Sequence, residues 1–198
     1  MADDFYDIRL LGFADFKASR RFLCALANEI WLSRWGRTPI SVYRPGDVNT
    51  GKAMRAELEK SSRITVISAH GYLGDYGLGF CGSNHARTLL KANDIEYIGA
   101  KSMLLIDACR TPKLAPLIKS SAETRGLIVG LDRAAGEDDK DQETQGCDSV
   151  TALAAVIREI CYPREKNLFR PAVKTAIAGV NSQIKARNSK DMRLIRVY

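Results

Sequence analysis

The sequence has no apolar run long enough to cross a membrane and no secretory leader at its start. Its apolar stretches are far shorter than the ~18 residues that a membrane-spanning helix needs. The first four residues, Met1 to Asp4, include two aspartates, whereas a secretory signal would be basic and then apolar. We therefore expect a soluble, cytoplasmic protein that has no membrane partner.

The cysteines lack the pairing of a disulfide scaffold or of a zinc site built only from cysteine. There are five, an odd number, and no two form a Cys-x-x-Cys pair. They are Cys24, Cys81, Cys109, Cys147 and Cys161. Each is therefore interpreted as an individual thiol, and no cofactor is implied.

Excess positive charge is confined to the last part of the chain. The formal net charge is +7, and the stretch from Arg158 to Tyr198, with ten basic and three acidic residues, accounts for all of it. A surface that stacks nucleic-acid bases places aromatic side chains regularly among its charges, and this stretch does not. We expect solvated helix faces here rather than a nucleic-acid partner.

Short apolar runs alternate with stretches of helical period, which is typical of an α/β protein. The expected strands are 8–13, 40–43, 64–68, 103–106, 127–131 and 194–198. The expected helices cover 16–30, 52–60, 114–118, 150–160 and 173–184, and the first carries Phe16, Leu23, Leu26 and Ile30 on one stripe. The pattern predicts one domain over residues 1–198, with a six-stranded, mainly parallel sheet and helices on both faces.

Two expected strands end in reactive side chains. The first leads into His70 and Gly71, and the second leads into Asp107 and Cys109. The carboxyl ends of parallel strands meet at one edge of a sheet, where ligands and chemistry collect. A single crossover joins the two strands, so we expect them to be neighbours and His70 to lie near Cys109.

A thiol beside an imidazole suits acyl-transfer chemistry. The thiolate is the attacking form of cysteine, and an imidazole favours it and later donates a proton to the departing amine. Gly71 has no Cβ, so its backbone can approach a substrate carbonyl, and the N–H groups of Gly71 and Cys109 are natural oxyanion donors. The sequence thus predicts a His70–Cys109 dyad with an oxyanion hole and no metal.

This ordered pair of motifs resembles the caspase-like cysteine peptidases of clan CD. That group includes caspases, metacaspases, paracaspases, legumain, separase and the bacterial CHAT-domain proteases. The segment LIDACR at 105–110 is especially similar to bacterial caspase homologues and paracaspases, and 126–181 looks like the later part of a CHAT-like domain. The resemblance implies a thiol protease built on a six-stranded sheet.

The resemblance also implies a role for Asp107. In metacaspases and paracaspases an acidic residue two positions before the nucleophile lines the S1 pocket and receives Arg or Lys. A basic side chain is the physical complement of a buried carboxylate. Asp15 and Asp132 follow strands that end at the same edge and would add to this pocket. The simpler alternative is that Asp107 caps the helix after Cys109.

Residues 133–148 stand apart because they carry six acidic side chains and no large apolar one. This composition predicts an exposed loop, which is either a solvated connection or a regulatory or processing segment. If the protein is made as a zymogen, Lys140 is the expected processing site and Arg133 the second choice. Bacterial members of the family often act in regulated cell death or phage defence, so the expected partners are a protein substrate and a separate sensor or activator protein.

Three other interpretations stay open. Residues 46–52 have the spacing of a P-loop, but Ala53 stands where the magnesium-binding hydroxyl belongs. Cys81 and His85 would complete a zinc site with the two dyad residues, although the glycine-rich setting of 79–82 indicates a flexible loop. The last alternative keeps the caspase-like fold without catalysis, as an interaction module.

Overall fold

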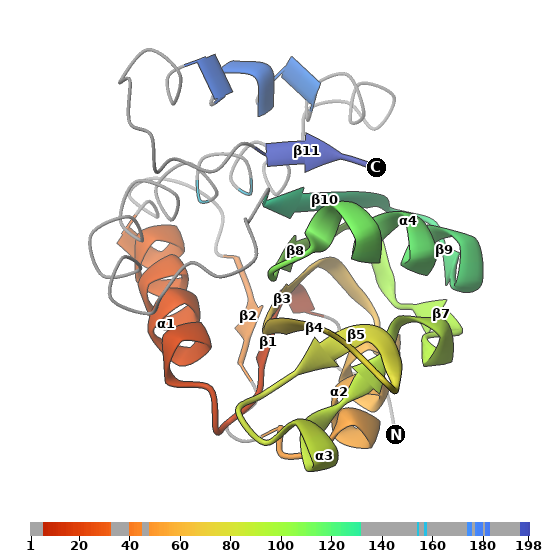
Figure 1. Ribbon diagram of the computed structural model, residues 1–198. Coiled ribbons are helices and arrows are strands. Elements are labelled where there is room, and N and C mark those ends of the chain that lie inside the picture. Colours follow the sequence, from red (N-terminus) through yellow and green to blue (C-terminus); the bar gives the residue numbers. More distant parts are fainter. Residues whose placement is uncertain are drawn as a thin grey trace.

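The structure of the chain is a computed structural model (Figure 1). It describes residues 6–32, 40–44, 48–131, 154, 157, 174, 175, 177–179, 181, 182 and 195–198. The predicted loop at 133–148, with Arg133 and Lys140, lies outside the described residues, and so does Asp132. Most of the two helices expected at 150–160 and 173–184 lies outside them too.

Six strands form the main sheet in the order β11-β10-β8-β3-β1-β2. They are β1 (Tyr6–Gly12), β2 (Val42–Tyr43), β3 (Ser62–Ser68), β8 (Ala100–Asp107), β10 (Leu127–Leu131) and β11 (Ile195–Val197). Neighbours are parallel except β10 and β11, which are antiparallel. The prediction of a six-stranded, mainly parallel α/β sheet is therefore confirmed.

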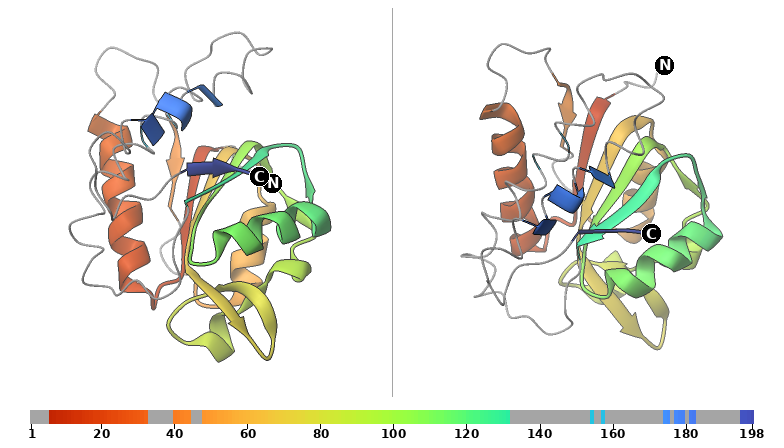
Figure 2. Two further views of the ribbon diagram at one scale, coloured as in Figure 1. Left: turned by 45° about the horizontal axis from the view of Figure 1, so that its top comes forward. Right: turned by 90° about the horizontal axis from the view of Figure 1, so that it is seen from above.

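Helices pack on both faces of this sheet (Figure 2). On one face lies α1 (Lys17–Leu32), and on the other lie α2 (Gly51–Glu59) and α4 (Thr111–Ser121). Successive strand side chains point to opposite faces, so Leu10 packs in the apolar cluster of α1 and Leu11 in that of α2 and α4. None of the described helices is long and apolar enough to cross a bilayer.

The expected stripe on the first helix is only partly correct. Leu23, Leu26 and Ile30 pack together on the α1 face of the sheet, as their spacing predicts. Phe16 instead belongs to the cluster on the opposite face. The reason is that α1 begins at Lys17, so Phe16 precedes the helix and the helical period does not set its direction.

A second, smaller sheet follows β3. Its strands are β4 (His70–Gly74), β5 (Gly77–Cys81) and β6 (Leu90–Lys91), paired antiparallel in that order. The expectation of a flexible loop at 79–82 is therefore wrong. Gly79 is needed because a Cβ there would lie 2.3 Å from the Leu90 carbonyl oxygen, and Gly77 turns the hairpin with φ of +93°.

The remaining elements are short and complete the layer around α2 and α4. They are α3 (His85–Thr88), η1 (Ala92–Asp94), β7 (Tyr97–Ile98) and β9 (Glu123–Thr124). The two strands of this group, β7 and β9, pair in parallel. Their pairing joins the segment just before β8 to the segment just after α4.

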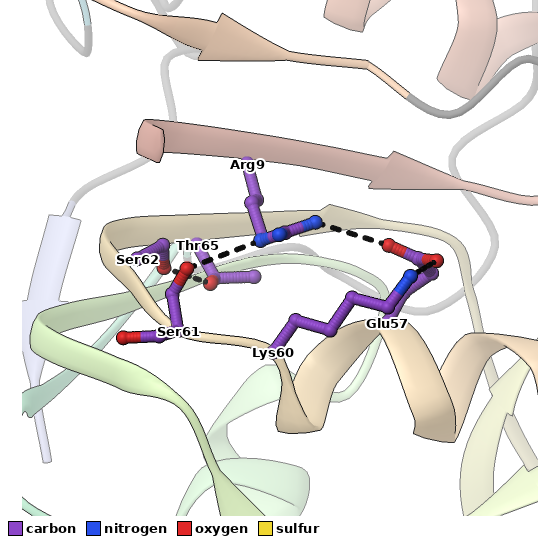
Figure 3. Close-up of polar contacts among 6 residues, drawn as sticks. All are labelled: Arg9, Glu57, Lys60, Ser61, Ser62 and Thr65. Atoms are coloured by element: carbon purple, nitrogen blue, oxygen red, sulfur yellow. Dashed lines mark hydrogen bonds and ion pairs between the residues drawn. The ribbon is translucent and has the colours of Figure 1, made fainter. Parts of the chain in front are cut away.

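A buried arginine joins strands of the main sheet to α2 (Figure 3). Arg9 on β1 is only 3% exposed, and its Nη1 lies 3.2 Å from Glu57 Oε2 on α2. Its Nε–H donates to the Ser61 carbonyl oxygen at 3.3 Å. Its guanidinium lies 4.5 Å from the ring centre of Tyr43 and 5.3 Å from that of Tyr6. These contacts satisfy a charge that would otherwise be costly to bury.

We predict that Glu57→Gln lowers the free energy of unfolding by about 3 kcal/mol, because it leaves the Arg9 charge buried without its counter-charge. The matched control is Glu59→Gln on the same helix. Glu59 also pairs with an arginine, Arg55, at 2.9 Å, but both side chains are more than a third exposed, so little change is expected. Urea denaturation of the two variants measures the difference, and equal losses would contradict the assignment.

Candidate active site

The chain leaves the main sheet at the end of β3 and passes directly over the end of β8. The two strands pair in parallel up to Ser68 and Asp107, which are register partners. Pairing continues one step further, because the Ala69 N–H donates to the Asp107 carbonyl oxygen at 3.1 Å. His70 then opens β4 at this edge. The expectation that the two strands are neighbours is therefore confirmed.

The backbone of Gly71 lies against the backbone of Cys109. A Cβ placed on Gly71 would be 1.7 Å from the Cys109 carbonyl oxygen and 3.2 Å from the Cys109 Cα. No side chain fits in that space, so only glycine allows the approach. The structure thus brings the His70–Gly71 segment and Cys109 together, although they are far apart in the sequence.

The His70 imidazole is half-buried and stacked on one aromatic ring. It stacks on the ring of Phe16, with 3.7 Å between ring centres and 30° between planes. The ring of His85 lies edge-on to it, with 6.3 Å between centres. In the small sheet, His70 is the register partner of Cys81. His70 is thus fixed from both the β1–α1 turn and the small sheet.

Cys109 stands in a tight turn between β8 and α4. It is partly exposed, and the next residue, Arg110, has φ of 62° and ψ of 17°. Arg110 is the only non-glycine residue with positive φ in the described part of the chain. This left-handed conformation costs ~1 kcal/mol for a residue with a Cβ, and such strain is typical of functional sites. The turn also includes a hydrogen bond from Thr111 Oγ1 to the Ala108 carbonyl oxygen at 2.6 Å.

Asp107 is fully buried, at 0% exposure, and belongs to a polar chain beneath the strand ends. Its Oδ2 accepts a hydrogen bond of 2.7 Å from Ser68 Oγ. The Ser68 carbonyl oxygen in turn accepts one of 2.6 Å from Ser19 Oγ on α1. Asp107 does not cap the following helix, because the N-cap residue of α4 is Arg110. The helix-cap alternative is therefore wrong.

Ser68 was not identified from the sequence as a site residue. Two signals were present: it precedes His70 by two positions, as Asp107 precedes Cys109, and it ends a strand. Serine at a strand end is common, so neither signal alone would have distinguished it. The hydrogen bond to Asp107 is what places it in the site.

Asp15, proposed for the acidic pocket, contacts the turn that follows β5. Its Oδ2 accepts a hydrogen bond from the Asn84 N–H at 2.7 Å, and its carbonyl oxygen accepts one from Ser83 Oγ at 2.9 Å. Its Oδ1 lies so close to Gly82 that a Cβ there would be 1.9 Å away. The Asp15 carboxylate therefore joins the β1–α1 turn to the segment that follows β5. The Asp107 carboxylate accepts from Ser68 instead, so the two carboxylates proposed for one pocket contact different segments.

The described part of the 46–52 motif and the expected zinc ligands are accounted for in other ways. Gly51 begins α2, whose N-cap Thr50 accepts from the Ala53 N–H, and a Cβ on Gly51 would lie 2.1 Å from the Leu89 carbonyl oxygen. Close packing thus explains this glycine without a phosphate. Within the described residues, no three His, Cys, Asp or Glu side chains are grouped to hold a metal ion.

Comparison with protein-family models and with curated protein sequences found no match. The interpretation of the site therefore depends on its residues and their geometry. Those residues are a partly exposed thiol, an imidazole held over an aromatic ring, and a buried carboxylate, all at one sheet edge. This combination suits nucleophilic attack on a carbonyl carbon.

We predict that iodoacetamide at pH 8 alkylates Cys109 and leaves Cys81 unmodified. Burial, with a further contribution from the Asp15 charge, raises the pKa of the Cys81 thiol to about 12. That thiol is therefore protonated at pH 8, and it is also closed to solvent. Mass spectrometry of tryptic peptides measures the two sites, and faster alkylation of Cys81 would contradict this assignment of the reactive thiol.

Proposed function

We propose that this protein is a cysteine endopeptidase in which Cys109 is the nucleophile and His70 the acid and base. The observation that carries the proposal is the close approach of Gly71 to Cys109, which only a glycine permits. It brings the imidazole segment beside a partly exposed thiol at the edge where parallel strands end. The resemblance of the two motifs to caspase-like peptidases supports the same assignment.

The proposed reaction has two steps. The Cys109 thiolate forms a C–S bond to the scissile carbonyl carbon, and the carbonyl electrons move to its oxygen. When the C–N bond breaks, the His70 imidazolium gives its proton to the departing amine. The acyl part of the substrate stays bound to Cys109 as a thioester. A water molecule then attacks the thioester, losing its proton to His70, and the peptide acid departs as the Cys109 sulfur is released.

The backbone N–H groups of Gly71 and Cys109 are the proposed donors to the oxyanion. Fixed donors of this kind contribute about 3 kcal/mol each to lowering the barrier. The packing of Gly71 on Cys109 and the left-handed turn at Arg110 hold both segments in place before substrate arrives. Such preorganisation is what makes a backbone donor effective, since no groups have to be reoriented during the reaction.

Specificity for Arg or Lys at P1 is assigned to Asp107. Its carboxylate is buried at the same strand edge and oriented by Ser68 Oγ. A carboxylate in low-dielectric surroundings interacts strongly with a cationic side chain that reaches it. The substrate is a protein, and the family resemblance suggests regulated cell death or phage defence in bacteria, with a separate sensor or activator protein as the second partner.

We predict that Cys109→Ala and His70→Ala each abolish cleavage of a peptide library, while the thermal unfolding midpoint changes little. Both side chains lie at the sheet edge and are only partly buried, so the apolar core stays intact. The controls are Cys81→Ala and His85→Ala, which are expected to retain activity because Cys81 is protonated and closed to solvent and His85 is exposed.

Two results would contradict the assignment. Loss of activity in Cys81→Ala or His85→Ala, with activity kept in Cys109→Ala and His70→Ala, would identify a different pair. A wild-type protein that cleaves no member of the library would favour the interaction module. In either case the fold described above is unaffected.

We also predict that Asp107→Asn weakens the preference for a basic P1 residue by about 2 kcal/mol, roughly 30-fold, since a desolvated cation is left without its partner. The variant keeps the side-chain shape and an oxygen that accepts from Ser68. Asp94→Asn, on the exposed η1 turn, is the control and should leave the preference unchanged. A positional-scanning peptide library measures the ratio; a wild-type preference for P1 Asp would exclude this pocket.

A further inference from the structure

Phe16 occupies an unusual place for a core aromatic residue. It is 4% exposed and packs in the same apolar cluster as Phe13, yet one face of its ring stacks directly on His70. Its backbone is held on both sides: the N–H donates to the Phe13 carbonyl oxygen and the carbonyl oxygen accepts from the Arg20 N–H, each at 3.2 Å. The ring therefore offers His70 a fixed platform.

The two supports of His70 are joined to each other. Asp15, the residue before Phe16, accepts the Asn84 N–H at 2.7 Å, and Ser83 Oγ donates to its carbonyl oxygen. Ser83 and Asn84 lie just after β5, whose last residue, Cys81, is the register partner of His70. The β1–α1 turn, which leads to Phe16, is thus hydrogen-bonded to the segment that follows β5, the strand that pairs with His70.

We propose that Phe16 is a positioning residue, whose ring sets the orientation of the His70 imidazole. The inference rests on the proposed function, in which His70 exchanges protons with Cys109 and with the leaving group. An imidazole on a strand end can rotate about two side-chain torsions, and a stacked ring removes most of that freedom. The face of an aromatic ring also attracts the imidazolium cation that forms during the reaction.

Orientation of this kind affects the chemical step more than substrate binding. A displacement of about 1 Å in a catalytic group can lower a rate by as much as 100-fold. Phe16 is buried beneath His70, so it contributes to substrate affinity only through that side chain. Its removal should therefore lower kcat and leave KM nearly unchanged.

The experiment compares Phe16→Leu with Phe13→Leu, measured well below both unfolding midpoints. Both variants remove a ring from the same apolar cluster, but only Phe16 stacks on His70. We expect kcat to fall about tenfold in Phe16→Leu, with KM changed less than twofold, and both constants to be nearly normal in Phe13→Leu. Phe16→Tyr keeps the ring and should restore kcat.

Equal kcat in the two leucine variants, or a Phe16→Tyr variant no better than Phe16→Leu, would overturn the proposal. If Phe16→Leu does not fold, Phe16→Met replaces it, since an unbranched side chain fills the space without a flat face. A loss expressed in KM instead of kcat would also overturn it, because Phe16 would then shape the substrate site.

A spectroscopic measurement separates this inference from the proposed function. The chain has two histidines, so a His85→Gln variant assigns the imidazole NMR signals of His70. Stacking on Phe16 shifts those signals by the ring current, and Phe16→Leu should remove the shift while Phe13→Leu retains it. Unchanged His70 signals in Phe16→Leu would overturn the stacking. If wild-type protein had no peptidase activity, the proposed function would fail, and this shift alone would decide whether Phe16 orients His70.

Discussion

Parallel pairing between β3 and β8 determines where the proposed active site is located. The register places Ser68 opposite Asp107, so the residues that follow each strand leave the sheet at the same point. His70 comes two positions after Ser68, and Cys109 comes two positions after Asp107. A slip of one residue in this pairing would turn the side chains of one strand to the opposite face and separate the two segments. The apolar clusters on both faces hold the register, because each strand buries side chains in both layers.

The site edge and the opposite part of the sheet satisfy their polar groups differently. Near the site, buried hydrogen bonds connect Ser19, Ser68 and Asp107 across three elements. Toward the other end of the strands, Arg9 is matched by Glu57 and by two tyrosine rings. Each group is costly to bury alone and acceptable when paired. Among the described residues, the sheet therefore carries one buried carboxylate, Asp107, at the edge of the candidate site and one buried cation, Arg9, whose guanidinium lies toward the start of β3.

The fold could be predicted from the sequence further than the site could. All six main strands were predicted from short apolar runs, and the signal is strongest in β3 and β8, because a strand buried on both faces has no polar side to interrupt it. The small sheet could not be recognised, because its glycines are dictated by backbone contacts that the sequence does not reveal. The stacking of Phe16 on His70 was missed for a similar reason: its spacing fits the α1 stripe, and only the start of the helix at Lys17 excludes it. The turn at Arg110 gives no signal, since arginine is not a residue that favours positive φ.

The segment between β3 and β8 separates His70 from Cys109 in the sequence. The chain passes through the β4–β5 hairpin, whose tip at Gly74, Asp75 and Tyr76 is exposed. A single peptide-bond break at this tip would place His70 on one fragment and Cys109 on the other. The two fragments would still be joined by the main-sheet pairing and by the contact at Gly71, both of which lie outside the tip. A nicked form of this fold would therefore be a heterodimer, in which one chain carries His70 and the other carries Cys109.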